Sequence, residues 1–180
     1  MIIKQATKDD APFVARCVVM ALHLDPEQED LTHISEICAR EDVLYSWRHA
    51  LIAFEAGQPI GLCLCYDGAD YHATRERTFR LFGQGSNDDM DLEHMEDETG
   101  PGEYYIDSLA VLPEFRRRGI ARKLMQAQLE RGRQLGLPKA TLLVDPDNPD
   151  AQALYRECGF GHDREVYAFG QIFWKWQKML

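Results

Sequence analysis

The feature that most restricts the fold of this chain is a basic, glycine-containing turn between a strand-like segment and a helix-like segment. Tyr104–Leu112 has the character of a strand, and a helical pattern runs from about Gly119 to Leu135 before Gly136 closes it. Lys139–Val144 then has the composition of another strand. A strand, a helix and a strand in this order form a βαβ unit, so the sequence predicts two parallel strands joined by a right-handed crossover.

The turn has the chemistry of an anion site. A helix start exposes unpaired backbone N–H groups and the positive end of the helix dipole, and the stretch from Arg116 to Lys123 adds five cationic side chains. Gly119 lacks a Cβ, so the backbone there could approach a phosphate closely. The Gly-Lys-Ser/Thr ending of a P-loop and the three-glycine dinucleotide fingerprint are both missing from the sequence. The alternative is a solvated basic turn that caps an ordinary helix.

Two motifs, in order along the chain, carry a resemblance to a known family. The first follows Leu109–Phe115, a strand end with a Pro-Glu-Phe turn, and the second begins after the strand at Lys139–Val144. They are Arg116-x-x-Gly119-x-Ala121 and Asn148-x-x-Ala151-x-x-Leu154-Tyr155-x-x-x-Gly159-Phe160. With these motifs the chain resembles the GNAT superfamily of acyl-CoA-dependent N-acyltransferases.

The resemblance implies a fold. We expect an α/β (α+β) chain with one N-acetyltransferase domain over residues 1–180. The implied sheet is mixed and mostly antiparallel, with a central pair of splayed parallel strands and flanking helices. An acidic insertion at about 71–102 exceeds the family's usual connection. Within it, His72–Phe82 is predicted to form a helix, and Gly83–Gly102 a mobile loop because it has almost no apolar residues.

The resemblance also implies a cofactor site for acetyl-CoA as the co-substrate. The strand backbone would pair with the pantetheine arm, the turn would hold the pyrophosphate, and the thioester would lie where the parallel strands splay. Backbone N–H groups near Val111 could polarise the thioester carbonyl. The implied cofactor-binding residues are Leu109, Ala110, Val111, Arg116, Arg117, Arg118, Gly119, Ile120, Ala121, Arg122, Asn148 and Tyr155.

Three residues are candidates for the acid and base of the reaction. By the resemblance Tyr155 would protonate the leaving thiolate, which suits a phenol with a pKa near 10 facing a thiol with a pKa near 8.5. The alternative is a core position, because Ala151, Leu154, Tyr155 and Cys158 have ordinary helical spacing. Glu103 and Asp107 share a strand face, so either could accept the amine proton, while Asp107 could instead satisfy a neighbouring loop.

Direct attack by the amine is favoured, because neither Cys nor Ser has a convincing nucleophile setting beside His. The predicted function is therefore transfer of an acetyl group from acetyl-CoA to a primary amine. One alternative is a non-catalytic acyl-CoA-binding regulatory module, and another is an acidic interaction protein whose basic turn binds no cofactor.

The acidic stretch between Asp88 and Asp107 contains no Lys or Arg. It could attract a cationic small-molecule or peptide amine, such as a polyamine, an aminoglycoside-like drug, a lysine or an N-terminal amine. Two other interpretations are a disordered, solubilising loop and a loop that folds against Arg75, Arg77 and Arg80.

Composition narrows the partners further. The formal net charge of −10 and a pI near 5.0 argue against general binding to nucleic acid or anionic membranes. No signal peptide or membrane span is apparent, so we expect a soluble, cytoplasmic protein. The five cysteines are expected to be reduced thiols, and the six histidines have no metal-ligand spacing, so no metal is predicted. The alternating aromatic residues of Ile172–Trp176 suit a terminal strand's core face, and their exposed remainder could support a homodimer.

Overall fold

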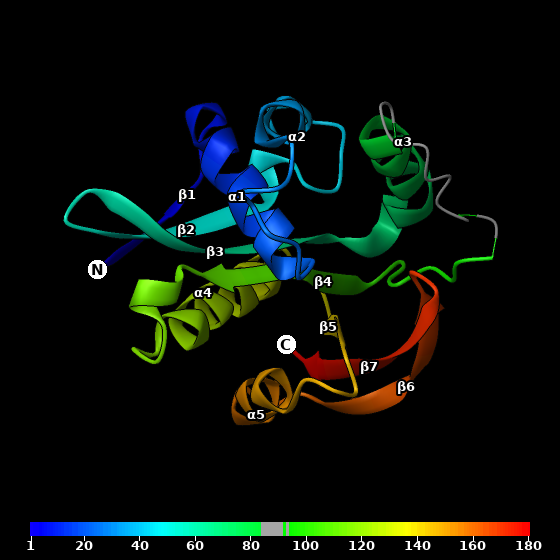
Figure 1. Cartoon of the computed structure of the whole chain (residues 1–180). Helices are drawn as coiled ribbons and strands as arrows, with labels where there is room; N and C mark the ends of the chain where they lie inside the picture. The colour runs from blue at the N-terminus through cyan, green and yellow to red at the C-terminus, as the bar shows by residue number, and fades with distance from the viewer. Residues whose placement is uncertain (84–91, 93) are drawn as a thin grey trace. The chain divides into compact units, whose positions relative to one another are not determined.

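The computed structural model describes residues 1–83, 92 and 94–180, and Figure 1 traces them along the chain. They divide into two compact units, one made of 1–65 and 108–128 and the other of 66–107 and 129–180. The expectation of one domain over 1–180 stays a prediction.

The secondary structure includes the predicted strand, helix and strand of the βαβ unit and the predicted helix of the insertion. The strands are β1 (Ile2–Gln5), β2 (Ala50–Glu55), β3 (Gln58–Asp67), β4 (Glu103–Val111), β5 (Lys139–Val144), β6 (Gly161–Ala168) and β7 (Gln171–Met179). The α-helices are α1 (Ala11–Ala21), α2 (Leu31–Cys38), α3 (Tyr71–Gly83), α4 (Ile120–Gln134) and α5 (Pro149–Glu157). Short 3-10 turns lie at Lys8–Asp10, Trp47–His49, Gly68–Asp70 and Pro113–Phe115.

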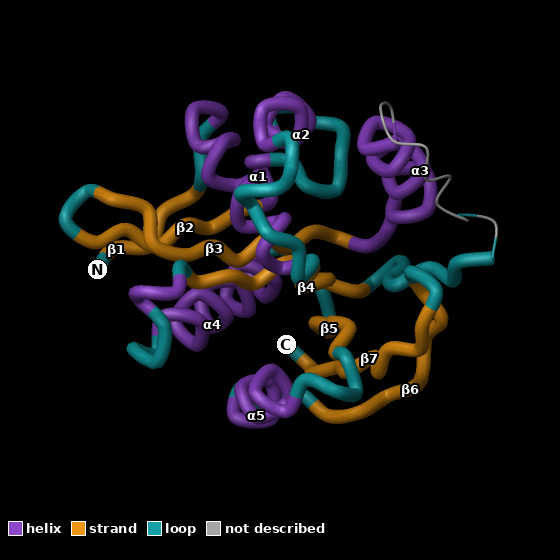
Figure 2. The backbone as a smooth tube through the Cα atoms, in the orientation of Figure 1, coloured by secondary structure: helices purple, strands orange, loops and turns teal. Residues whose placement is uncertain are grey.

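The strands form a mixed sheet in the order β1-β2-β3-β4-β5-β7-β6. β4 and β5 are parallel, whereas β1 and β2, β2 and β3, β5 and β7, and β6 and β7 are antiparallel neighbours. Helices flank the strands, as the colouring by secondary structure makes plain (Figure 2). The predicted fold class, a mostly antiparallel sheet with a parallel pair and flanking helices, is confirmed.

In the unit of 1–65 and 108–128, local sequence signals determine how the chain turns. Thr7 and Asp10 form a capping box ahead of α1. Ala56 and Gly57 have φ values of 50° and 83°, the left-handed backbone that a tight two-residue hairpin between β2 and β3 requires. In Figure 1, α1 and α2 lie on one side of β1–β3 and α4 lies on the other.

A buried amide ties α4 to the β3 strand of the same unit. Gln128 is fully buried, and its Nε2 donates to the carbonyl oxygens of Cys63 at 2.6 Å and His49 at 3.1 Å. A buried amide without partners would be costly, so these bonds fix the register of the helix on the strands.

The unit of 66–107 and 129–180 contains α3, α5 and the strands β5, β6 and β7. β7 pairs with β5 on one side and with β6 on the other. The C-terminal strand is therefore interior, and its backbone offers no free edge for a second copy; the sheet ends at β6 instead. Along the aromatic run, Trp176 is buried whereas Ile172 is 51% exposed. The homodimer stays a prediction.

The acidic insertion contains the predicted helix, which forms α3. Residues 84–91 and 93 of the predicted mobile loop lie outside the described residues. The segment 94–102 packs closely, because Met95, Glu98 and Thr99 are buried. Arg75 of α3, 2% exposed, donates to the carbonyl oxygens of Met95 at 3.0 Å and Leu92 at 3.3 Å. For this segment the interpretation of a loop folded against Arg75 is the correct one.

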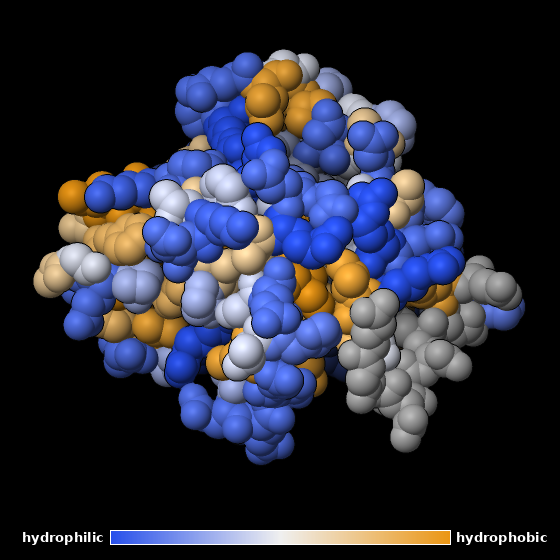
Figure 3. Space-filling view, turned by 90° about the horizontal axis from the view of Figure 1, so that it is seen from above, coloured by the Kyte–Doolittle hydropathy of each residue, from blue (hydrophilic) through white to orange (hydrophobic). Residues whose placement is uncertain are grey.

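All five cysteines are free and buried, as expected for reduced thiols. Burial raises the pKa of Cys17 and Cys38 to about 12, so neither thiol has nucleophilic character. Hydrophilic side chains cover most of the face seen in Figure 3, as the acidic composition suggests. Among the described residues, no helix combines the length and apolar character needed to cross a bilayer.

Candidate active site

The predicted anion site is a loop whose backbone combines extended and left-handed conformations. Arg116 has an extended conformation, Arg117 has φ 62° and Gly119 has φ 73°. The carbonyl oxygen of Gly119 accepts the first helical hydrogen bond, from Lys123 N at 3.2 Å. The backbone amides of Ile120 and Ala121 therefore have no acceptor within the helix. Left-handed residues just before a helix gather such amides into an anion-binding concavity.

Two arginines of the turn hold the loop in place. The Nε of Arg116 donates to the carbonyl oxygen of Val111 at 3.0 Å, which ties the turn back to the end of β4. Arg118 pairs with Glu55 at 2.7 Å and lies over the Phe115 ring. Their guanidinium groups thus brace the turn and add positive charge beside the backbone amides of the helix start.

Gly119 is required by backbone conformation. A Cβ built there meets nothing within 4 Å, so the surroundings within the protein are open, while its positive φ favours glycine. The concavity, the helix start and the open approach together fit a diphosphate such as that of acyl-CoA.

The parallel strands pair over a short stretch only. The register joins Glu103–Ile106 to Lys139–Leu142, whereas β4 continues to Val111 and β5 to Val144. Leu109, Ala110 and Val111 of the implied pantetheine site therefore lie beyond this parallel register, near the turn that Arg116 holds. Close packing supports this end of β4: a Cβ on Gly61 would be 3.0 Å from the carbonyl oxygen of Ala110.

Asn148 and Tyr155 lie on α5 and its cap. Asn148 Oδ1 accepts from Ala151 N at 3.0 Å, so this side chain caps the helix. The Tyr155 ring is half-buried and packs edge-on against Phe160, with ring centroids 6.3 Å apart. Cys158 of the same helical stripe is buried, so the stripe contributes to the core while leaving the Tyr155 ring partly accessible.

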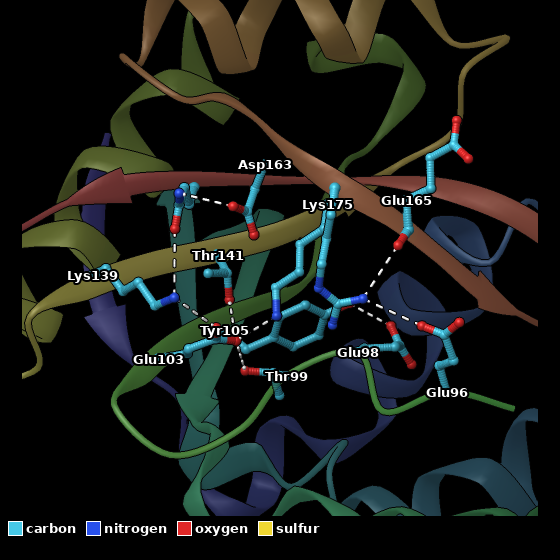
Figure 4. Close-up of polar contacts among 12 residues, drawn as sticks. Glu96, Glu98, Thr99, Glu103, Tyr105, Lys139, Thr141, Asp163, Glu165 and Lys175 are labelled. Carbon is cyan, nitrogen blue, oxygen red and sulfur yellow. Dashed lines mark hydrogen bonds and ion pairs between the residues drawn. The ribbon is translucent and has the colours of Figure 1, made fainter.

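Glu103, one candidate base, lies in a buried ionic network (Figure 4). Its carboxylate pairs with Lys175 at 2.6 Å and Lys139 at 2.9 Å, and accepts from Thr99 at 2.9 Å and Thr141 at 3.2 Å. Burial alone would raise the pKa of Glu103, but these partners outweigh it and lower the pKa to about 2. A carboxylate held so firmly in its charged form is a weak base, and it ties together β4, β5 and β7.

Asp107, the other candidate, accepts a hydrogen bond from the Tyr66 hydroxyl at 2.6 Å and is half-buried. Burial, and next the charge of Asp107, raise the pKa of Tyr66 well above its usual value, so the phenol stays a neutral donor. One partner of Asp107 is thus a tyrosine at the end of β3.

Comparisons with known proteins place the chain in a family. The model of the acetyltransferase (GNAT) family matches residues 18–160. The chain belongs to this family. The predicted enzyme class, a GNAT-type acetyltransferase, is thereby confirmed.

Individual relatives extend the comparison. A solved acetyltransferase is 28% identical over 99% of both chains, with a TM-score of 0.79. The protein yncA from Salmonella typhimurium, solved with its cofactor acetyl-CoA, has the same fold at 16% identity and a TM-score of 0.62, with coverage of 99% of this chain and 93% of that one. N-alpha-acetyltransferase 30 of Schizosaccharomyces pombe is 35% identical over 65 residues, which is 36% of this chain and 43% of the relative. The match thus spans less than half of that curated relative.

One group that sequence reasoning missed in this GNAT chain is Glu98 of the insertion. It is buried, and its carboxylate accepts from the hydroxyls of Tyr71, at 2.5 Å, and Tyr105. Burial, followed by the charge of Asp107, raises the pKa of Glu98 to about 7. Its sequence context is a run of acidic residues, in which nothing distinguishes the one carboxylate that folding buries.

Proposed function

We propose that this GNAT chain transfers an acetyl group from acetyl-CoA to a primary amine by direct attack of the amine. The observation that carries the proposal is the turn before α4, where Arg117 and Gly119 have left-handed backbones just before a helix start. Such an arrangement gathers backbone amides into an anion site. When bound, acetyl-CoA supplies a thioester that an amine can attack. The turn would hold the diphosphate, and the backbone of Leu109–Val111 would align the pantetheine arm.

Tyr155 is the proposed acid, assigned by the family motif in which it stands. A phenol with an ordinary pKa near 10 can donate a proton to a thiolate whose thiol has a pKa near 8.5. Its edge-on contact with Phe160 restricts the ring while leaving it partly accessible, as a proton donor requires.

Asp107 is the proposed base, since the primary ammonium must lose a proton before it can attack. Its carboxylate is half-buried and therefore within reach of solvent and substrate, and the Tyr66 hydroxyl fixes its orientation. Glu103 is less suited, because two lysines and two threonines already occupy its carboxylate.

The proposed acceptor is a small-molecule or peptide amine. A peptide N-terminus is supported by the match to N-alpha-acetyltransferase 30, and the net charge of −10 favours cationic acceptors in general. The alternative remains a non-catalytic acyl-CoA-binding module that keeps the turn and has lost turnover.

Two measurements test the proposal. Calorimetry with acetyl-CoA tests the donor site, and saturable binding is expected. Thiol release across a panel of polyamines, lysine derivatives and peptides with free N-termini tests turnover. Binding without turnover on any amine would favour the regulatory module, and absence of binding would reject both CoA-dependent functions.

The acid is tested with Tyr155→Phe, for which we expect kcat with the best amine to fall roughly 10²-fold or more. Tyr167→Phe, at a tyrosine 44% exposed on β6, is the matched control and should leave kcat unchanged. An unchanged pH profile and kcat in Tyr155→Phe would remove the tyrosine from the mechanism.

A further inference from the structure

A compact group of tyrosines and carboxylates lies where the insertion meets β3 and β4. The rings of Tyr66, Tyr71 and Tyr105 have centroids 5.7 to 6.4 Å apart, and all three are almost fully buried. Their hydroxyls bond to two carboxylates: Tyr66 to Asp107, and both Tyr71 and Tyr105 to Glu98. All five residues belong to the unit of 66–107 and 129–180.

The Glu98 carboxylate is held in place by the backbone around it. Arg75 binds the carbonyl oxygens of Met95 and Glu96, at 3.0 and 3.4 Å, and the Asp97 carboxylate at 3.0 Å. These contacts fix the residues immediately before Glu98, so the insertion presents this carboxyl group to the tyrosines in one arrangement.

The charges around Glu98 come from three elements. Arg75 and Tyr71 face it from α3, Tyr105 and Asp107 from β4, and Tyr66 from the end of β3. Burial and next the negative charge of Asp107 oppose ionisation of the carboxyl group, while the hydrogen bonds from Tyr105 and Tyr71, and then Arg75, favour it. Two interacting carboxyls of unequal burial titrate as a pair, with the less exposed one keeping its proton longer.

We propose that Glu98 and Asp107 share one proton near neutral pH, and that Glu98 is a positioning residue that controls how strongly Asp107 accepts the proton of the amine. The proposal rests on the proposed function, in which Asp107 is the base. While Glu98 carries its proton, it adds no negative charge beside Asp107. Once Glu98 ionises, its negative charge strengthens the hold of Asp107 on a proton taken from the substrate ammonium; Asp107 then returns that proton to solvent.

The test compares the wild type with Glu98→Gln between pH 6 and 8. Glutamine keeps the shape and can still bond to Tyr71 and Tyr105, but it stays neutral like protonated Glu98. The ratio of wild-type to variant kcat should therefore lie within about twofold at pH 6 and rise to between about threefold and tenfold at pH 8. Because titration of the amine affects both proteins equally, it cancels in the ratio.

Glu96→Gln is the matched control, an identical change two residues away at a carboxylate whose side chain is 53% exposed and paired with Arg164. Its ratio should stay near one at every pH. If Glu98→Gln lowers kcat by the same factor at pH 6 and pH 8, Glu98 has a structural role only and the proposal is wrong.

A second readout is independent of turnover. Between pH 8 and pH 6, wild type should take up about one proton that Glu98→Gln does not, as measured by potentiometric titration of the folded proteins. Equal uptake would overturn the shared proton whatever the activity. If the difference appears but wild type acetylates no amine, the proposed function fails while the shared proton stands.

Discussion

Replacing Lys175 with methionine should remove the central cation of the Glu103 network while nearly preserving side-chain volume. Lys175 is 3% exposed and its Nζ lies 2.6 Å from Glu103 Oε2. Removing one partner of a buried ion pair typically costs about 3–5 kcal/mol, because the remaining charge stays buried. Lys139, Thr99 and Thr141 still bind Glu103 in the variant, so we expect a loss of about 2–3 kcal/mol at pH 7.

The lowered pKa of Glu103 gives a second, independent value for the contribution of the network to stability. The network lowers the pKa of Glu103 from 4.5 to about 2, which at about 1.4 kcal/mol per unit corresponds to at most about 3.5 kcal/mol of stability. Solvent near the partly exposed Lys139 screens the Glu103 carboxylate, so we expect the network to contribute about 2 kcal/mol to the free energy of unfolding. Because the folded pKa is the lower one, this stability is present above pH 4.5 and is lost as the pH falls towards 2.

The assay is urea unfolding of the wild type and Lys175→Met at pH 7 and pH 3. The difference in free energy of unfolding should shrink by about 1–2 kcal/mol at pH 3, where the unfolded state binds the proton. Lys139→Met, at a lysine whose side chain is 30% exposed, is the control and should cost about 1 kcal/mol or less. A loss below about 0.5 kcal/mol for Lys175→Met at pH 7, or a loss independent of pH, would refute this account of the network.

Two glycines give further predictions. Gly119→Ala should weaken acetyl-CoA binding about tenfold or more, as measured by calorimetry. Its φ of 73° is strained for alanine, and the new Cβ enters the approach to the turn. The control is Gly57→Ala, with φ 83° and open surroundings, which should cost a similar stability of about 1 kcal/mol and leave the affinity unchanged. Gly68→Ala should destabilise the protein by roughly 1–3 kcal/mol in thermal unfolding, since its Cβ would lie 2.5 Å from the carbonyl oxygen of Gly100. Gly100→Ala is the control, because a Cβ there meets nothing within 4 Å. Equal stabilities of the two variants would contradict the close approach at Gly68.

The sequence by itself determined the parts of this protein that depend on neighbouring residues. The helix start at Ile120, the left-handed Gly119 and the hairpin at Ala56 and Gly57 follow from backbone preferences that act over a few residues. The parallel pair follows from the βαβ pattern and the mixed sheet from the resemblance that the motifs carry, so the fold class could be predicted. The anion site stays a prediction.

Only the tertiary structure decided the electrostatics of the carboxylates. Glu98, Glu103 and Asp107 are similar acids in an acidic stretch, yet one is buried against tyrosines, one is surrounded by lysines and one stays half-exposed. Lys175, which holds Glu103, lies 72 residues away along the chain. The pKa of a carboxyl group depends on the charges and the solvent around it, and folding brings these together from distant positions, so local sequence patterns do not contain them.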